Sequence, residues 1–225
     1  MSKSFLKEGE YLKKELSDKE IFRSFKALFE KTLQKDTSYV FVFLKTILDC
    51  KNISKENFSI DFDNLFESFA DIYWSLIINY GIKQKAVSFY NKGSYVEQIL
   101  FNAFNESRID ADSSFYDLPE NIRLAVVKEI KQKCKAGVLT ALYTDTECIM
   151  YSFSLKDEVL TLNPRVYDFL QKNKRTINRL NCTALAEFYE KINSSDTDYL
   201  KEKFYLTKDC YGFKVYINVL MDLFM

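Results

Sequence analysis

Apolar residues recur at intervals of three and four over most of the chain, and the densest such stripe lies in the segment 35–49. Its members are Val40, Phe43, Leu44, Ile47 and Leu48. The unbroken apolar run 39–44 is also typical of a buried strand, but the spacing continues beyond the usual length of a strand. We therefore expect a helix that is capped by Asp36 or Thr37 and lies in the middle of the core.

A helix is predicted on each side of this segment. Ser17 and Glu20 have the spacing of a capping box. The apolar stripe that follows them, which is expected to face the core, consists of Ile21, Phe22, Phe25, Leu28, Phe29 and Leu33. Only a short turn then precedes the central segment, so these two helices are expected to pack antiparallel. The range 61–80 has the clearest helical period in the chain, with Gly81 as its C-terminal cap. Trp74 lies beside that stripe, where a packing role is favoured over a ligand platform.

The second half of the chain combines helical stripes with a short β-rich region. The helical stripes occupy 96–104, 119–137, 164–179, 185–192 and 213–225. Between Gly137 and Asn163 the pattern changes to short segments rich in β-branched and aromatic residues. These segments, 138–143, 148–154 and 159–162, predict a small antiparallel meander.

The predicted fold is mainly α, a multi-helix domain with a small antiparallel β-meander at about 138–162. With 225 residues, of which 47% are hydrophobic and 16% aromatic, the chain can bury a sizeable core. Residues 1–16 are charged and weakly patterned, and we expect a flexible arm there. The remainder, 17–225, is expected to form a single mainly helical domain. In the alternative, the acidic stretch 106–120 divides it into two subdomains, 17–105 and 117–225.

The composition excludes several classes of active site. The sequence contains no histidine, so Ser-His and Cys-His catalysis and His-ligated metal sites are excluded. Its five cysteines include no Cys-x-x-Cys pair and are typical of reduced core residues in a cytosolic protein. The sequence has no glycine-rich phosphate loop and no apolar run long enough for a signal peptide or a membrane span. We therefore expect a cytoplasmic protein with no cofactor.

Catalysis by a carboxylate-bound metal needs no histidine, and two acidic patterns bear on it. Glu129-Ile130-Lys131 matches only the short half of a nuclease motif and falls on a predicted helix. A second acidic set, at the start of the 61–80 helix, is better explained as a cap and a solvated face. It consists of Asp61, Asp63, Glu67 and Asp71. We therefore predict no catalytic residue and no metal site.

Two basic clusters, 128–135 and 165–179, are the features that suggest a partner. Formal net charge is zero, from 32 basic and 32 acidic side chains, so a nucleic-acid surface has to be a local patch. A solvated helix face is the alternative for both clusters. Asn173, Asn178 and Asn181 add groups that can hydrogen-bond to the bases or to the backbone of a nucleic acid. The candidate nucleic-acid-binding residues are Lys172, Lys174, Arg175, Arg179, Arg165, Lys131 and Lys135.

Six groups of residues, spread over most of the chain, carry a family resemblance. They are Phe25-Lys26-Ala27 with Lys35-Asp36-Thr37-Ser38-Tyr39, Ile72-Tyr73-Trp74 through Tyr80-Gly81, Ala141-Leu142-Tyr143-Thr144-Asp145-Thr146, Tyr151-Ser152-Phe153, Leu162-Asn163-Pro164 and Ala186-Glu187-Phe188-Tyr189-Glu190-Lys191-Ile192-Asn193. Together they resemble the N-terminal region of a bacterial group of HNH endonuclease-like proteins, found near restriction and mobile-element genes. In that group a helix similar to 216–224 runs into the nuclease module, which has Cys-x-x-Cys knuckles and metal-binding histidines. Because this sequence ends at Met225 and contains no histidine, no catalytic residue carries over.

The resemblance implies a helical region that precedes the nuclease and either places it on DNA or holds a partner. We expect a non-catalytic DNA-engaging or positioning module of bacterial defence or restriction, cut from a longer nuclease or left after loss of the nuclease. The alternative is a protein-interaction subunit or inhibitor in a phage-defence system. An exposed apolar patch that includes Trp74 or the 213–224 stripe would favour this alternative. A self-contained enzyme ranks third.

Overall fold

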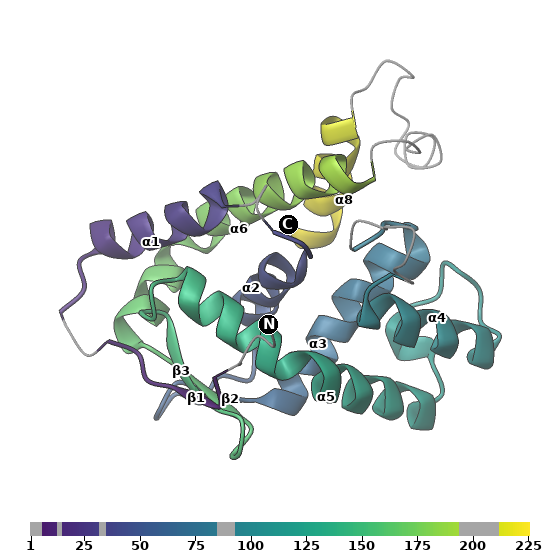
Figure 1. Ribbon diagram of the computed structural model, residues 1–225, viewed down its shortest axis with the longest axis horizontal. Helices are drawn as coiled ribbons and strands as arrows, with labels where there is room; N and C mark the ends of the chain where they lie inside the picture. The colour runs from purple at the N-terminus through teal and green to yellow at the C-terminus, as the bar shows by residue number, and fades with distance from the viewer. Residues whose placement is uncertain (1–5, 13–14, 32–34, 85–92, 194–211) are drawn as a thin grey trace, which may run out of the picture.

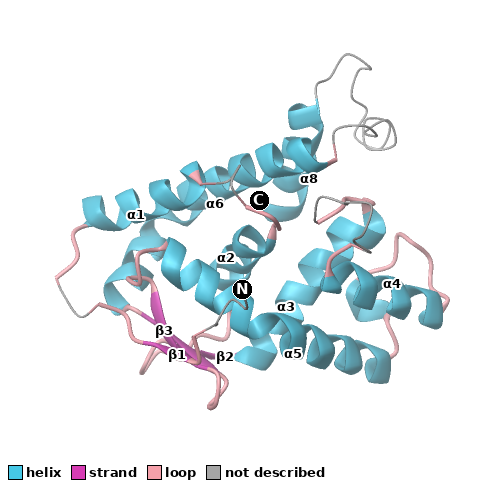
Figure 2. Ribbon diagram, viewed as in Figure 1, coloured by secondary structure: helices cyan, strands magenta, loops and turns pink. Residues whose placement is uncertain are grey.

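Helices make up most of the protein, and a small antiparallel sheet lies at one end of them (Figure 1, Figure 2). The computed structural model describes residues 6–12, 15–31, 35–84, 93–193 and 212–225. Its helices are α1 (Asp18–Glu30), α2 (Tyr39–Asp49), α3 (Phe62–Trp74) with a π-helical turn (Ser75–Asn79), α4 (Tyr95–Ser107), a 3-10 turn (Phe115–Asp117), α5 (Glu120–Asp145), α6 (Pro164–Ile192) and α8 (Gly212–Phe224). The strands are β1 (Glu8–Gly9), β2 (Ser59–Asp61), β3 (Tyr151–Ser154) and β4 (Val159–Leu162). The predicted mainly α fold with a small antiparallel sheet is confirmed.

Helix α2 lies in the middle of the bundle, in contact with α3, α5 and α6 (Figure 1). Every residue in 40–48 is buried, including Lys45, whose Nζ donates a 2.6 Å hydrogen bond to a carbonyl oxygen in the last turn of α8. The helix prediction for this segment is confirmed over the strand alternative. The predicted cap at Asp36 or Thr37 is wrong, because the residue that precedes the helix is Ser38. The Ser38 hydroxyl is buried and bonds to core side chains instead of capping the helix.

Segments far apart in the sequence pair to form the sheet, whose strand order is β1-β3-β4-β2 with every pair antiparallel. The hairpin of β3 and β4 falls within the predicted meander. The two outer strands come from elsewhere in the chain. Strand β1 lies in the segment 1–16, which the sequence predicts to be a flexible arm, and β2 leads directly into α3. The sheet therefore holds together the start of the chain, the segment that leads into α3, and the hairpin of β3 and β4.

Helix α5 runs without a break through Gly137, where the sequence predicted its end. Buried residues recur at every fourth position from Val126 to Leu142, so the apolar residues of 138–143 continue the buried face of the first half. A glycine inside a helix costs about 1 kcal/mol relative to alanine, which is less than the burial of one further Val or Leu side chain contributes. The strand prediction for 138–143 is therefore wrong, and the predicted meander is reduced to the hairpin 151–162.

Helix α6 is a single continuous helix where the sequence predicted two, and α1 packs against it (Figure 1). The rings of Phe25 and Phe169 stack with their centroids 6.3 Å apart. The expected antiparallel packing of α1 on α2 is wrong, because α2 is already covered by α3, α5 and α6. Helix α1 therefore lies against α6 and α5.

Trp74 and five described residues of the 213–224 stripe, the two apolar features that would have favoured a protein-interaction surface, are buried. Trp74 is fully buried, and its Nε1 donates a 2.8 Å hydrogen bond to the carbonyl oxygen of Ser113, so the predicted packing role is confirmed. Helix α8 places its apolar face against α6, and the buried side chains are Val215, Tyr216, Val219, Leu220 and Phe224. A single hydrophobic cluster includes residues from both 17–105 and 117–225. No helix in the described ranges is long and apolar enough to cross a membrane.

Candidate nucleic-acid interface

Two lysines of the basic cluster on α5 are held by carboxylates of neighbouring elements. Lys131 Nζ lies 2.5 Å from Asp63 Oδ1 at the start of α3 and 2.6 Å from Glu158 Oε2 in the turn between β3 and β4. Lys135 Nζ also bonds to Glu158. Hydrogen bonds from both lysines hold the pKa of Glu158 below its ordinary value. This network ties α5 to α3 and to the sheet, and its positive charges are compensated within the protein.

Two cations of the α6 cluster are paired as well. The Arg165 guanidinium lies 3.2 Å from Asp18 Oδ1 on α1. Lys174 Nζ lies 3.1 Å from Asp49 Oδ1, and the other oxygen of Asp49 lies 2.6 Å from the ammonium of Lys45. These exposed pairs join α6 to α1 and α2, so both cations have acidic partners within the chain.

The other three cations of this cluster, Lys172, Arg175 and Arg179, are exposed on one face of α6. Their spacing of three and four residues places them on consecutive turns of the helix. None of the three forms an ion pair with any residue that the structure describes. Asp168, one turn before Lys172, is the acidic residue that borders them. We call Lys172, Arg175 and Arg179 the α6 stripe, which concentrates positive charge without an ion-pair partner in the described ranges, on a protein of zero net charge.

The asparagines of α6 do not reach this surface. Asn178 and Asn181 are 5% and 0% exposed and point toward α8 and α2. The Asn181 Nδ2 donates a 3.0 Å hydrogen bond to the carbonyl oxygen of Phe41. Asn173 Nδ2 donates a 2.9 Å bond to a carbonyl oxygen one turn earlier in its own helix. The prediction that Asn178 and Asn181 contact bases is therefore wrong, because the buried face of the helix includes them.

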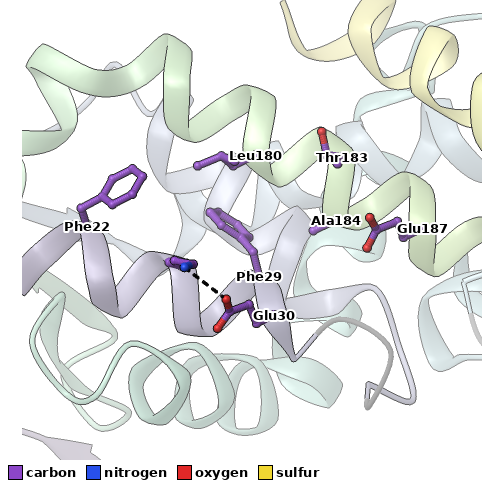
Figure 3. Close-up of a pocket in the computed structure, with 8 residues that line it drawn as sticks. Phe22, Phe29, Glu30, Leu180, Thr183, Ala184 and Glu187 are labelled. Atoms are coloured by element: carbon purple, nitrogen blue, oxygen red, sulfur yellow. Dashed lines mark ion pairs between the residues drawn. The ribbon is translucent and has the colours of Figure 1, made fainter.

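An open apolar groove of about 460 Å³ lies between α1 and α6 (Figure 3). Its apolar lining consists of Phe22, Phe29, Leu180 and Ala184, and its polar lining of Lys26, Glu30, Thr183 and Glu187. The sequence places Phe22 in the stripe predicted for the core, yet its side chain is 42% exposed. Helix α1 buries the neighbouring face instead, formed by Ile21, Phe25 and Leu28. The periodicity alone did not distinguish the two faces, because both carry aromatic residues.

The acidic residues at and within α3 have three different environments. Asp61 caps the helix, its Oδ1 accepting a 2.8 Å hydrogen bond from the Asn64 amide, as predicted. Asp63 and Glu67 pair with basic residues of α5. Asp71 is half-buried, and burial together with the nearby charge of Glu67 raises its pKa to about 6. Within the described ranges no group of three or more His, Cys, Asp or Glu residues is arranged to hold a metal ion.

The cysteines with described positions are free thiols. Cys134 and Cys182 are core residues, as predicted, and burial raises the pKa of Cys134 to about 12 and that of Cys182 to about 11. Both thiols therefore stay protonated at neutral pH and are poor nucleophiles. Cys210 lies outside the described residues. The features of the described surface that could contact a partner include the α6 stripe and the groove.

Comparison with known proteins does not add to this picture. No protein-family model, no curated protein and no solved structure matches the chain. The case for a function therefore depends on the exposed residues and on the sequence resemblance described above.

Proposed function

We propose that this chain is a non-catalytic module that engages DNA through the α6 stripe and positions an HNH-type nuclease of bacterial defence or restriction. One observation carries the proposal. Lys172, Arg175 and Arg179 are exposed on one helix face without an acidic partner among the described residues, whereas Lys131, Lys135, Arg165 and Lys174 all have such partners. Unpaired cations on one face are what phosphate contacts require.

The cellular setting follows from the same proposal. A module that positions a nuclease on bacterial DNA works in the cytoplasm, where the thiols of Cys134 and Cys182 stay reduced. Its partners are DNA and a nuclease module, either in the same polypeptide or as a separate subunit.

The experiment is a titration of fluorescein-labelled duplex DNA with the purified chain, followed by anisotropy at several salt concentrations. The test variant carries Lys172→Ala, Arg175→Ala and Arg179→Ala. We expect the loss of these phosphate contacts to weaken binding and to reduce the dependence of log K on log salt, by about one unit of slope for each residue removed.

A charge-matched control separates this site from the general charge of the protein. It carries Lys55→Ala, Lys133→Ala and Lys156→Ala, which remove the same charge from exposed positions on three other parts of the chain. We expect this control to bind DNA as the parent chain does. If the parent chain does not bind, or if both variants bind equally, the proposal is wrong.

The groove between α1 and α6 favours a second candidate, a protein-interaction subunit. Its apolar lining suits an apolar segment of a protein partner, and the exposed Glu187 on its edge suits a basic residue in that segment. A photoreactive phenylalanine analogue at position 22, tested in cells that express the native gene, should crosslink one protein. Ala184→Trp, which fills the groove, should abolish the crosslink. The absence of any crosslink, or one that Ala184→Trp leaves unchanged, would eliminate this candidate.

A further inference from the structure

The exposed face of α6 offers few of the groups that read base edges by paired hydrogen bonds. Asn and Gln amides recognise adenine edges, and acidic side chains accept from cytosine. On α6, Asn178 and Asn181 are buried against α8 and α2, and Asn173 is bonded to its own helix. Gln171, one turn before Arg175, is the exposed side-chain amide beside the stripe. Asp168 borders the stripe, but its negative charge opposes close approach of a phosphate backbone. Arg175 and Arg179 can pair with guanine, which their replacement by lysine tests, and the other contacts of the α6 stripe are those of cations with phosphates.

The same face lacks a stacking platform for unpaired bases. Proteins that bind single strands without sequence preference stack successive bases on exposed aromatic rings. The aromatic residues of α6 turn inward: Phe169, Phe188 and Tyr189 are buried, and the half-buried ring of Tyr167 lies 5.0 Å from that of Phe58. The exposed ring of Phe22 lies in the groove between α1 and α6, where Lys26 pairs with Glu30 and the charge of Glu187 repels phosphate. An unstacked strand would therefore gain little beyond its phosphate contacts.

The length of the α6 stripe fits the phosphates of a duplex. Lys172 and Arg179 are two helical turns apart, which is about 10 Å along the axis. One strand of B-DNA presents a phosphate about every 3.4 Å along its axis, so this length corresponds to about three phosphates. Acidic residues lie beyond both ends of the stripe, Asp168 before it and Glu187 after it, and they limit the contact to this length.

We propose that the α6 stripe binds duplex DNA of any base sequence, through about three phosphates of one strand. This inference rests on the proposed function, and it adds the form of DNA bound and the absence of sequence recognition. Recognition of a particular DNA base sequence is then the task of another part of the assembly. Release of about three counterions gives a salt dependence with a slope of about −3.

The experiment compares three ligands: two duplexes of about 20 base pairs with unrelated sequences, and one of their single strands. Each is titrated with the parent chain, with the triple Ala variant of the α6 stripe, and with the double variant Arg175→Lys and Arg179→Lys. The double variant keeps both charges but loses the forked guanidinium that reads guanine. We expect the two duplexes to bind within about 2-fold of each other, the single strand to bind more weakly, and the double variant to bind within about 3-fold of the parent. The triple Ala variant should lose about 10-fold or more at low salt.

The outcomes separate this inference from the proposed function. If the triple Ala variant loses duplex binding but one duplex is preferred by about 10-fold or more, or the single strand binds more tightly, the DNA-engaging role stands and this inference is wrong. A preference that disappears in the double variant would show that the arginines read guanine. If the triple Ala variant binds duplex DNA as the parent does, the proposed function and this inference are both wrong.

Discussion

Replacement of Asp71 by asparagine should stabilise the protein at neutral pH. The Asp71 carboxyl lies half-buried on α3, one turn after Glu67, and no described residue forms a hydrogen bond or an ion pair with it. Burial is the main cause of its raised pKa, and the charge of Glu67 adds to it. The folded protein therefore favours the protonated carboxyl, and ionisation of Asp71 works against folding. Asparagine has nearly the same shape and carries no charge.

The magnitude follows from the shift in the pKa of Asp71. The ordinary value of 3.8 rises to about 6 in the folded protein. Each unit corresponds to about 1.4 kcal/mol, so the full shift would amount to about 3 kcal/mol. Part of the carboxyl remains in contact with water, which screens the effect. We therefore expect Asp71→Asn to raise the free energy of unfolding at neutral pH by about 1 to 2 kcal/mol.

The sign of the pH dependence is fixed by the direction of the shift. Between pH 3.8 and about pH 6 the folded state binds more protons at Asp71 than the unfolded state does, so this group lowers stability as pH rises through that window. Above about pH 6 the destabilisation by ionised Asp71 has reached its full value, and below pH 3.8 it vanishes. The stability difference between Asp71→Asn and the parent chain should therefore grow from near zero at low pH to its full value at neutral pH.

Urea denaturation of the parent chain and of Asp71→Asn across this pH range measures the difference directly. Asp110→Asn is the control, because Asp110 is an exposed loop residue, and it should leave stability unchanged at each pH. If Asp71→Asn is no more stable than the parent chain at neutral pH, or if the difference between the two does not change with pH, the argument from burial is refuted.

Two further predictions concern contacts that hold the sheet. The double variant Lys131→Ala and Lys135→Ala leaves Glu158 without its partners. It should lower the free energy of unfolding, measured by urea denaturation, by about 1 to 3 kcal/mol. Replacement of the exposed lysines of the same helix by Ala should lower it little. In Gly9→Ala the new Cβ would lie 2.7 Å from Cε1 of Phe153, so we expect thermal unfolding at a temperature lower by several degrees. Unchanged stability in either variant would mean that these contacts do not hold β1 and the hairpin in place.

Local signals in the sequence were sufficient for the helices whose ends and faces depend on near neighbours. The capping box of Ser17 and Glu20 begins α1, with the Glu20 amide donating to the Ser17 hydroxyl and the Glu20 carboxylate accepting from the Ser17 amide. Gly81, with φ of +65°, follows the helical range 62–79 as its predicted cap. The helical period of α2 and α3 and the hairpin of β3 and β4 were likewise predictable. Each of these features is decided within a few residues along the chain.

The tertiary structure decided what depends on partners far away in sequence. The segment 138–143 has the composition of a strand, and it is helical because its apolar residues continue the buried face of α5. The sequence shows the basic residues but not their partners, since Lys131 meets Asp63 across 68 positions and Arg165 meets Asp18 across 147. Only the packing of α6 against α1, α2 and α8 determines which side chains of α6 are paired, which are buried and which remain free.

The sequence by itself thus determined the mainly helical class, the principal helices and the absence of histidine chemistry, because these depend on composition and on contacts of neighbouring residues. The tertiary structure decided the candidate site. It buried Asn178 and Asn181, paired Lys174 with Asp49, and left the α6 stripe exposed. The physical reason is that burial and ion pairing are properties of surfaces brought together by folding, and a periodic pattern does not specify which surfaces meet.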